Sequence, residues 1–260
     1  MTQEERRTYL IDRLLKEQPR YCKIEIPGGG EERKALLRSL FNIRPPWPAD
    51  AEFLKVQDDY LREETRLKGI TDIKELEPVD EDIYIWQGDI TTLRCDAIVN
   101  AANSQMLGCF IPCHGCIDNA IHTYAGIELR LECADIMERQ GHEEETGGAK
   151  ITPAFNLPCK YVIHTVGPIV TGALTEKDRR LLYSCYSSCL ELAAEKGIES
   201  IAFCCISTGE FHFPNEEAAK IAVKAVREFR ERFNGRMKVV FNVFKEKDLR
   251  IYRELFLKYT

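Results

Sequence analysis

The sequence lacks the long apolar segments of membrane and exported proteins. No stretch approaches the ~18 consecutive apolar residues of a membrane-spanning helix. Residues 1–7, MTQEERR, contain no apolar core of the kind that a signal peptide carries. We therefore expect a cytoplasmic protein with no membrane partner.

An excess of positive charge is also missing. The chain has 36 lysines and arginines against 42 aspartates and glutamates, which gives a net charge of −6. This balance argues against a basic surface for non-specific nucleic-acid binding, so we expect no nucleic-acid partner. A pocket in which backbone N–H groups bind an anionic ligand is still compatible with this charge.

Low-complexity tracts and internal repeats are absent, and 44% of the residues are hydrophobic, which excludes a disordered or fibrous chain. A length of 260 residues predicts one large domain, or one domain with an appendage. The pattern of the sequence changes near residue 80. We therefore expect a helical N-terminal extension over residues 1–80 and a second domain over residues 81–260.

The expected extension is rich in charge and in helical periodicity. Apolar residues recur at helix spacing over residues 8–17, 31–43 and 50–68, and prolines end the first two of these segments. We interpret the triple glycine at positions 28–30 as a flexible entry into the second helix. A phosphate-binding loop is disfavoured there, because no strand precedes the glycines and no Lys-Ser/Thr pair follows them.

The second domain alternates between short apolar strands and amphipathic helices. The expected strands cover residues 83–86, 97–100, 161–165, 201–206 and 239–244. The expected helices cover residues 117–138, 176–196, 215–233 and 247–257. This alternation predicts an α/β fold, a three-layer α/β/α sandwich whose mostly parallel central sheet is covered by helices on both faces.

The chain has eleven cysteines, many more than a cytoplasmic enzyme needs. In a reducing compartment they should be free thiols, so each is core filler, a metal ligand or a nucleophile. Eight of them are expected in core or incidental positions, where cysteine behaves as a small hydrophobe. These are Cys133, Cys185 and Cys189 on expected helices, Cys204 and Cys205 within an expected strand, and the isolated Cys22, Cys95 and Cys159.

The remaining three cysteines flank a histidine in the segment Cys109-Phe110-Ile111-Pro112-Cys113-His114-Gly115-Cys116. Four soft ligands in eight residues, with a proline and a glycine that let the loop fold back, favour a zinc site. We favour one Zn²⁺ on three protein ligands, because a fourth position is then left for water or substrate and the site is catalytic. Spacing does not choose between Cys109 and Cys113. The alternative is a set of packed thiols beside a hydrogen-bonded His114.

Polar and glycine-rich segments follow the expected strands. Ligands of parallel α/β sheets bind at the carboxyl ends of the strands, so five such segments predict a nucleotide-like ligand. Backbone N–H groups ahead of the helix at residue 215 are suited to a diphosphate. The five segments cover residues 88–91, 100–104, 146–149, 164–168 and 207–214.

Six motifs in sequence order give the chain a close resemblance to the macrodomain family over about residues 81–260. They are Gly88-Asp89-Ile90-Thr91, Val99-Asn100-Ala101-Ala102-Asn103-Ser104, Asp118-Asn119-Ala120-Ile121-His122, Thr146-Gly147-Gly148-Ala149-Lys150-Ile151-Thr152, Tyr161-Val162-Ile163-His164-Thr165-Val166-Gly167-Pro168 and Ser207-Thr208-Gly209. Macrodomains bind ADP-ribose, and the MacroD-like branch hydrolyses it from modified proteins. The cysteine-containing loop replaces the glycine run of that branch and, with the helical extension, resembles the zinc-dependent macrodomains of microbes.

The resemblance implies a role for each motif residue. It implies Cys109, His114 and Cys116 as the zinc ligands, with Cys113 at a variable position. It implies that Asp118 and Asn103 are catalytic and that Asn100 and Asn103 face the distal ribose. A position favoured by the helix macrodipole is the alternative for Asp118. The residues implied to bind the adenine ring and the diphosphate are Asp89, Ile90 and Phe244, and Ser207, Thr208, Gly209, Glu210 and Phe211.

The function that we expect is therefore zinc-dependent hydrolysis of the bond between ADP-ribose and a mono-ADP-ribosylated protein side chain. The resemblance also implies two protein partners, a lipoylated glycine-cleavage H-like protein modified on an acidic residue and a sirtuin-like ADP-ribosyltransferase. Two alternatives stay open: a non-catalytic ADP-ribose-binding macrodomain, and a deacylase of O-acetyl-ADP-ribose. The zinc loop argues against the first alternative, because a protein that only binds has no use for an open metal beside the distal ribose.

Overall fold

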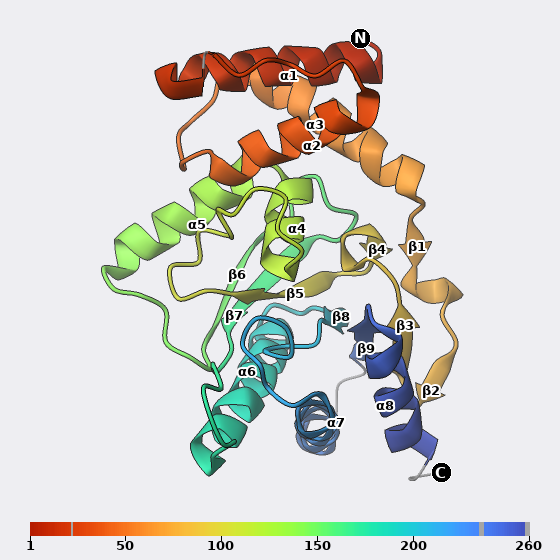
Figure 1. The fold of residues 1–260 in the computed structure, drawn as a ribbon. Helices are drawn as coiled ribbons and strands as arrows, with labels where there is room; N and C mark the ends of the chain where they lie inside the picture. Colours follow the sequence, from red (N-terminus) through yellow and green to blue (C-terminus); the bar gives the residue numbers. More distant parts are fainter. Residues whose placement is uncertain (22, 234–236, 258–260) are drawn as a thin grey trace.

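The computed structural model describes residues 1–21, 23–233 and 237–257, so Cys22 lies outside the described residues. Figure 1 shows three N-terminal helices stacked at one end of an α/β sandwich. The helices are α1 (Gln3–Glu17), α2 (Gly30–Ile43) and α3 (Ala51–Lys68). All three expected helices are confirmed, and Gly30 is the first residue of α2, in agreement with the interpretation of the triple glycine.

The three N-terminal helices have a small core of their own. Leu10 and Ile11 of α1, Leu37 of α2, and Phe53 and Leu61 of α3 pack in one hydrophobic cluster, separate from that of the sandwich. Ile127 is the residue of the sandwich that joins this cluster. The burial of so many apolar side chains gives the helices a packed interior, which short isolated helices in water would lack.

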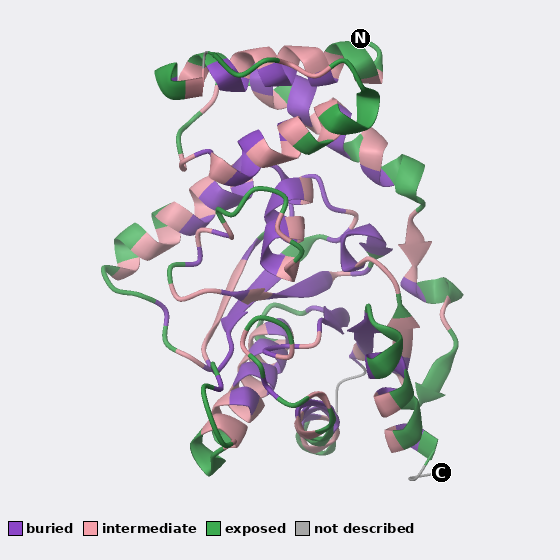
Figure 2. Cartoon of the chain, in the orientation of Figure 1, coloured by how far each residue is buried: buried purple, intermediate pink, exposed green. Residues whose placement is uncertain are grey.

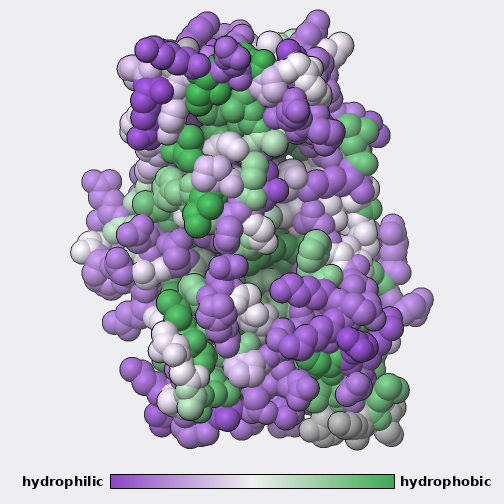
Figure 3. All heavy atoms as spheres, in the orientation of Figure 1, coloured by the Kyte–Doolittle hydropathy of each residue, from purple (hydrophilic) through white to green (hydrophobic). Residues whose placement is uncertain are grey.

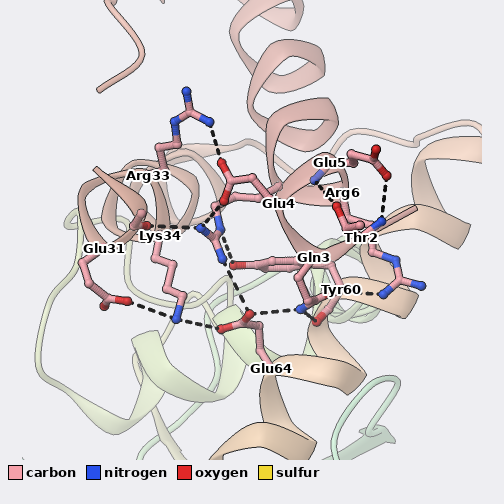
Figure 4. Close-up of polar contacts among 12 residues, drawn as sticks. Thr2, Gln3, Glu4, Glu5, Arg6, Glu31, Arg33, Lys34, Tyr60 and Glu64 are labelled. Atoms are coloured by element: carbon pink, nitrogen blue, oxygen red, sulfur yellow. Dashed lines mark hydrogen bonds and ion pairs between the residues drawn. The ribbon is translucent and has the colours of Figure 1, made fainter. Parts of the chain in front are cut away.

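Ion pairs join the exposed ends of the same three helices. Glu4 of α1 pairs with Arg7 of the same helix and with Arg33 of α2. Glu64 of α3 pairs with Lys34 of α2 at 3.7 Å. Figure 4 shows Glu64 between Lys34 and Gln3, to which it is also hydrogen-bonded. These contacts fix how the helices pack without touching the sandwich.

A seven-stranded sheet forms the centre of the sandwich, in the order β2-β3-β9-β8-β5-β7-β6. Its five inner strands run parallel, and the edge strands β2 and β6 are antiparallel to their neighbours. The strands are β2 (Pro78–Asp80), β3 (Ile83–Gln87), β5 (Ala97–Ala102), β6 (Ala149–Pro153), β7 (Tyr161–Val166), β8 (Ser200–Phe203) and β9 (Lys238–Val243). The mostly parallel sheet is confirmed. Strand β2 lies on the N-terminal side of the expected boundary at residue 80.

Short strands and 3₁₀ helices lie between the longer elements. Strands β1 (Thr71–Asp72) and β4 (Leu93–Arg94) pair with each other in a separate two-stranded sheet. The 3₁₀ helices are η1 (Pro19–Tyr21), η2 (Ile73–Glu75) and η3 (Ile90–Thr92). The chain therefore runs from α3 along the edge of the sandwich before it enters the sheet, as Figure 1 shows.

Helices cover both faces of the sheet. Figure 1 shows α4 (Ile117–Ala125) and α5 (Ile127–Gln140) on the side of the N-terminal helices, and α6 (Glu176–Glu195), α7 (Asn215–Arg232) and α8 (Glu246–Leu257) on the other side. Figure 2 shows that the sheet is mostly buried and that the helices turn their exposed residues outward. The expected three-layer arrangement is confirmed.

The structure corrects four local predictions. The expected helix over residues 117–138 is two helices, because Gly126 adopts a φ of 98° and ends α4. The expected strand over residues 201–206 ends at Phe203, so Cys204 and Cys205 follow the strand and do not lie within it. The last strand ends at Val243, which places Phe244 directly after it. Edge strands β2 and β6 were not expected, since β2 is exposed and only one residue of β6 is fully buried.

Among the described residues, every cysteine is a free thiol. Six of them are buried, as expected for small apolar side chains, and Cys205 is half-buried. On the face drawn in Figure 3, hydrophilic and hydrophobic residues are interspersed. Of the helices in the described ranges, none is long and apolar enough to cross a bilayer.

Candidate active site

The polar segments meet at one edge of the sheet. Strands β3, β5, β7, β8 and β9 are parallel, so the loops that follow them leave the same edge. The segment at residues 146–148 precedes antiparallel β6 and does not follow a strand, which corrects the expectation. It reaches the same edge because an antiparallel strand starts where its parallel neighbour ends. All five segments are therefore placed around one site.

Asp118 lies in the first turn of α4 and is held by two asparagines. Asn100 of β5 donates a hydrogen bond from Nδ2 to Asp118 Oδ1 over 2.8 Å, and Asn103 Nδ2 donates to Asp118 Oδ2 over 3.3 Å. Burial raises the pKa of the Asp118 carboxyl to about 6, although the hydrogen bond from Asn100 opposes that change. The two asparagines predicted to face the distal ribose and the predicted catalytic Asp118 thus form one cluster, with a carboxylate suited to accept a proton.

Two buried histidines, His122 and His164, contact this cluster. His164 Nδ1 is 3.2 Å from Asn100 Nδ2, and His164 Nε2 is 3.0 Å from Thr152 Oγ1. Because Asn100 can only donate from Nδ2, Nδ1 accepts and Nε2 carries the proton. Burial lowers the pKa of His164 to about 3, so its imidazole is neutral. His122 Nε2 lies 3.5 Å from Asp118 Oδ1, and burial also lowers the pKa of His122.

Sequence reasoning treated both histidines as ordinary and missed their place under the site. For His122, the one available signal was its position four residues after Asp118 on the same helix. For His164, the signal was a polar residue in an apolar strand, where a buried polar group needs a partner. His164 supports Asn100 through a hydrogen bond, whereas the ring nitrogens of His122 have no hydrogen-bond partner within the described structure.

The cysteine-containing loop brings three soft ligands together. The ligand atoms of Cys109, His114 and Cys116 all lie within 4.8 Å of one another, and Cys109 Sγ is 3.6 Å from His114 Nδ1. All three side chains are half-buried. Two thiols and an imidazole at this separation suit a zinc ion and leave a fourth position of a tetrahedron free.

The fourth potential ligand of the loop, Cys113, is not part of this group and contacts α2. Cys113 Sγ lies 3.3 Å from the Ala35 carbonyl and 3.3 Å from Ser39 Oγ, both on α2. A second compact group, His122, Cys133 and His164, also has ligand atoms within 4.8 Å of one another. Both nitrogens of His164 already have hydrogen-bond partners, so this second group is part of the buried support of Asp118.

The loop after β8 packs tightly against Gly167, the residue that follows β7. Ser207 adopts a φ of 63°, and its carbonyl accepts a hydrogen bond from Phe213 N over 2.9 Å. A Cβ atom built on Gly167 would lie 2.0 Å from Ser207 Oγ, so only a glycine fits there. Ser207 Oγ is buried and has no hydrogen-bond partner within the described structure. A buried hydroxyl in that state is suited to contact a ligand.

The other predicted residues of this loop lie further along it. Thr208 Oγ1 donates to the Cys205 carbonyl over 3.0 Å, and the carbonyl of Gly209 accepts from His212 N over 3.1 Å. Phe211 accepts a hydrogen bond from Val170 N on its carbonyl. Glu210 Oε1 is 3.9 Å from His114 Nε2. The expected diphosphate loop therefore meets the expected metal loop.

The residues predicted to bind adenine lie at the ends of β3 and β9. Asp89 Oδ1 accepts from Thr91 N over 3.0 Å, and Lys68 at the end of α3 pairs with Asp89 Oδ2 at 2.8 Å. Burial alone would raise the pKa of Asp89, but the contacts with Lys68 and Thr91 lower it. Ile90 is buried, whereas Phe244 is 76% exposed and free to cover a flat ring. Sequence reasoning gave no signal for Lys68.

The fold and this ring of loops define the class of the protein. The family model for the Macro domain matches residues 99–222, and the chain belongs to the macrodomain family. It is similar to a protein-ADP-ribose hydrolase of Treponema medium, with 60% identity over 98% of this chain and 99% of the relative. A protein-ADP-ribose hydrolase of Staphylococcus aureus strain MRSA252 is 50% identical over 95% of this chain and 94% of the relative.

A solved structure supports the same fold. The Trypanosoma brucei macrodomain in complex with ADP-ribose is 33% identical, with a TM-score of 0.64. The match covers 84% of this chain and 94% of the trypanosomal one. Because the shared region is longer than the Macro domain match, part of the chain outside residues 99–222 also has a structural counterpart.

Proposed function

We propose that this protein is a zinc-dependent hydrolase that releases ADP-ribose from mono-ADP-ribosylated protein side chains. The observation that carries the proposal is the meeting of two groups at the start of α4. Cys109, His114 and Cys116 form a three-ligand set, and Asp118, two residues after Cys116, is held by two asparagines. The relatives named protein-ADP-ribose hydrolase support the reaction class.

Each part of the ligand has a place in this proposal. Asp89 accepts a hydrogen bond from the adenine amino group, Ile90 lies alongside, and Phe244 stacks on the ring. The loop formed by Ser207, Thr208, Gly209, Glu210 and Phe211 binds the diphosphate, and the unpartnered Ser207 Oγ supports this assignment. Backbone N–H groups of the loop supply the donors, so no net positive charge is needed.

The reaction breaks the bond between C1″ of the distal ribose and the oxygen of the protein side chain. Asn100 and Asn103 hold the carboxylate of Asp118 in one orientation, and Asp118 accepts the proton of the attacking water. Zinc on Cys109, His114 and Cys116, when bound, would lower the pKa of a water or polarise a ribose hydroxyl. His122 and His164 are neutral because burial lowers the pKa of each, so neither adds a positive charge beside Asp118.

The proposal also includes a division into two domains, a cellular location and two protein partners. Residues 1–80 form a helical extension and residues 81–260 the macrodomain, a division supported by the separate hydrophobic cluster of the three N-terminal helices. A cytoplasmic location is supported by the free thiols of the described cysteines. The proposed partners are a lipoylated glycine-cleavage H-like protein modified on an acidic residue and a sirtuin-like ADP-ribosyltransferase.

The test is to incubate the protein with a mono-ADP-ribosylated protein and with O-acetyl-ADP-ribose, each with and without a zinc chelator. Release of ADP-ribose from the protein substrate, lost on chelation, is the expected result. Binding of ADP-ribose without any release would identify a non-catalytic macrodomain. Turnover of O-acetyl-ADP-ribose alone would identify a deacylase, and either of these results would overturn the proposal.

A further inference from the structure

Helix α2 of the N-terminal extension contacts the cysteine-containing loop of the sandwich directly. Asn42, near the end of α2, accepts a hydrogen bond on Oδ1 from Cys113 N over 2.9 Å. Its other side-chain atom, Nδ2, donates to Thr123 Oγ1 on α4 over 2.9 Å. Asn42 is only 1% exposed; its bond to Thr123 is buried, and its bond to Cys113 is partly buried. Asn42 thus ties the loop to the helix that carries Asp118.

Arg38, one turn earlier on α2, holds the backbone of a metal-ligand candidate. Its Nη2 donates to the carbonyl of His114 over 2.9 Å, and its Nη2 and Nε both donate to Asn119 Oδ1, over 2.8 Å and 3.2 Å. A planar guanidinium presents donors in a fixed fork, so it holds two acceptors in a defined relation. Arg38 therefore fixes the position of His114 relative to α4.

Asn119 extends the same contact to the other side of the loop. Its Nδ2 donates to the carbonyl of Ile111 over 3.0 Å and lies 3.4 Å from the carbonyl of Cys109. Arg38 and Asn119 together therefore hold the backbones of His114 and Cys109. The third candidate ligand, Cys116, is the N-cap residue of α4, and its Sγ accepts a hydrogen bond from Asn119 N over 3.4 Å. Two of the three ligands are thus positioned through one arginine of the extension.

The backbone of the loop needs this support at Cys113. This residue has a φ of 54°, a left-handed conformation that a non-glycine side chain disfavours. Its N–H is the group that Asn42 accepts from, and the next residue, His114, closes a turn by donating to the carbonyl of Ile111 over 3.2 Å. Without Asn42 the strained turn loses an outside contact that keeps His114 directed toward Cys109.

We propose that the N-terminal extension positions the zinc ligands, with Arg38 and Asn42 as positioning residues. The inference rests on the proposed function, because it assigns the extension to the same three-ligand site. Groups that orient metal ligands typically change metal affinity or activity by about 10–100-fold when they are removed. The extension and the catalytic loop then form one functional unit.

The experiment compares Arg38→Met and Asn42→Ala with two matched controls. Arg33→Met removes an arginine from the same helix whose partners, Glu4 and the Pro27 carbonyl, lie within the extension. Thr123→Val removes the hydrogen bond between Asn42 and Thr123 but leaves the one between Asn42 and Cys113. Zinc affinity is measured by competition with a chromophoric chelator, and the Co²⁺-substituted protein reports thiolate ligation by its absorption. ADP-ribose binding and thermal midpoints are measured in parallel.

We expect Arg38→Met and Asn42→Ala to bind zinc at least 10-fold more weakly, with lower kcat and unchanged KM and ADP-ribose affinity. Arg38→Lys should lie between Arg38→Met and the wild type, since an ammonium can reach one acceptor but not two. The inference is overturned if Arg38→Met and Asn42→Ala lose thermal stability yet keep wild-type zinc affinity and kcat. It is also overturned if their zinc affinity falls no further than that of Arg33→Met and Thr123→Val. If the wild type hydrolyses its substrate without zinc, the proposed function fails, while zinc affinity still tests the positioning role.

Discussion

Asn100 donates a hydrogen bond to Asp118 over 2.8 Å, and both side chains are buried at the centre of the site. The same Asn100 amide reaches His164, so the carboxylate, the amide and the imidazole form one line from the site into the core. A rigid support of this kind keeps the catalytic group in one geometry. The position of Asp118 thus reflects more than its favourable place near the helix N-terminus.

The first prediction concerns Asp118 itself. Asp118→Asn keeps the shape and the contact with Asn100 but cannot accept a proton. We expect kcat for release of ADP-ribose to fall on the order of 10²-fold or more, the range of general acid–base catalysis. ADP-ribose affinity, measured by calorimetry, should change little. A variant with nearly wild-type kcat would show that Asp118 only shapes the pocket.

The second prediction uses two glycines of the β7–α6 connection. A Cβ atom at Gly167 would lie 2.0 Å from Ser207 Oγ and 2.9 Å from Ile206 Cγ2, so Gly167→Ala must displace the loop that we assign to the diphosphate. We expect about tenfold weaker ADP-ribose binding, or about 1.4 kcal/mol. Gly172→Ala is the control, because a Cβ atom there meets nothing within 4 Å. Equal affinity of the two variants would count against this assignment.

The third prediction concerns pH. Burial lowers the pKa of His164 to about 3, below its ordinary value of 6.5. Below about pH 6.5 the unfolded chain therefore binds a proton that the folded chain does not, so this histidine makes the free energy of unfolding fall as the pH falls toward 3. Denaturant unfolding of the metal-free protein across that window measures the loss. An NMR titration in which the His164 imidazole protonates near pH 6.5 would contradict it.

The sequence-based predictions were reliable for the long periodic elements of the fold. The α/β alternation predicted the mostly parallel sheet, because buried parallel strands are apolar over their whole length. Strand β6 was missed because, at the edge of the sheet, it lacks this continuous burial. The break at Gly126 was missed because apolar spacing continues across it, and only its positive φ reveals that the helix ends there.

Contacts between distant segments were beyond the sequence. Arg38 and Asn119 are 81 positions apart, and nothing in the local pattern of α2 marks Arg38 as different from its neighbours. The same holds for Lys68 and Asp89, 21 positions apart. The motifs indicated which residues belong to the site, whereas the structure was needed to show which side chains hold them in place.

The fourth prediction compares two cysteines of one loop. Cys116→Ala removes a proposed zinc ligand, and Cys113→Ala removes a thiol that faces α2. We expect Cys116→Ala to lose zinc and release of ADP-ribose while it still binds ADP-ribose, because the adenine and diphosphate contacts lie in other loops. Cys113→Ala should keep its zinc. A zinc content that falls equally in both variants would mean that the ligand set is different.

Zinc reconstitution of the chelated wild-type protein tests the central claim most directly. Zinc is added back in steps while release of ADP-ribose from a mono-ADP-ribosylated protein is measured. We predict that the metal-free protein binds ADP-ribose but releases none, and that activity rises linearly to a plateau at one zinc per chain. Full activity in the metal-free protein, or no recovery with one bound zinc per chain, would contradict the account.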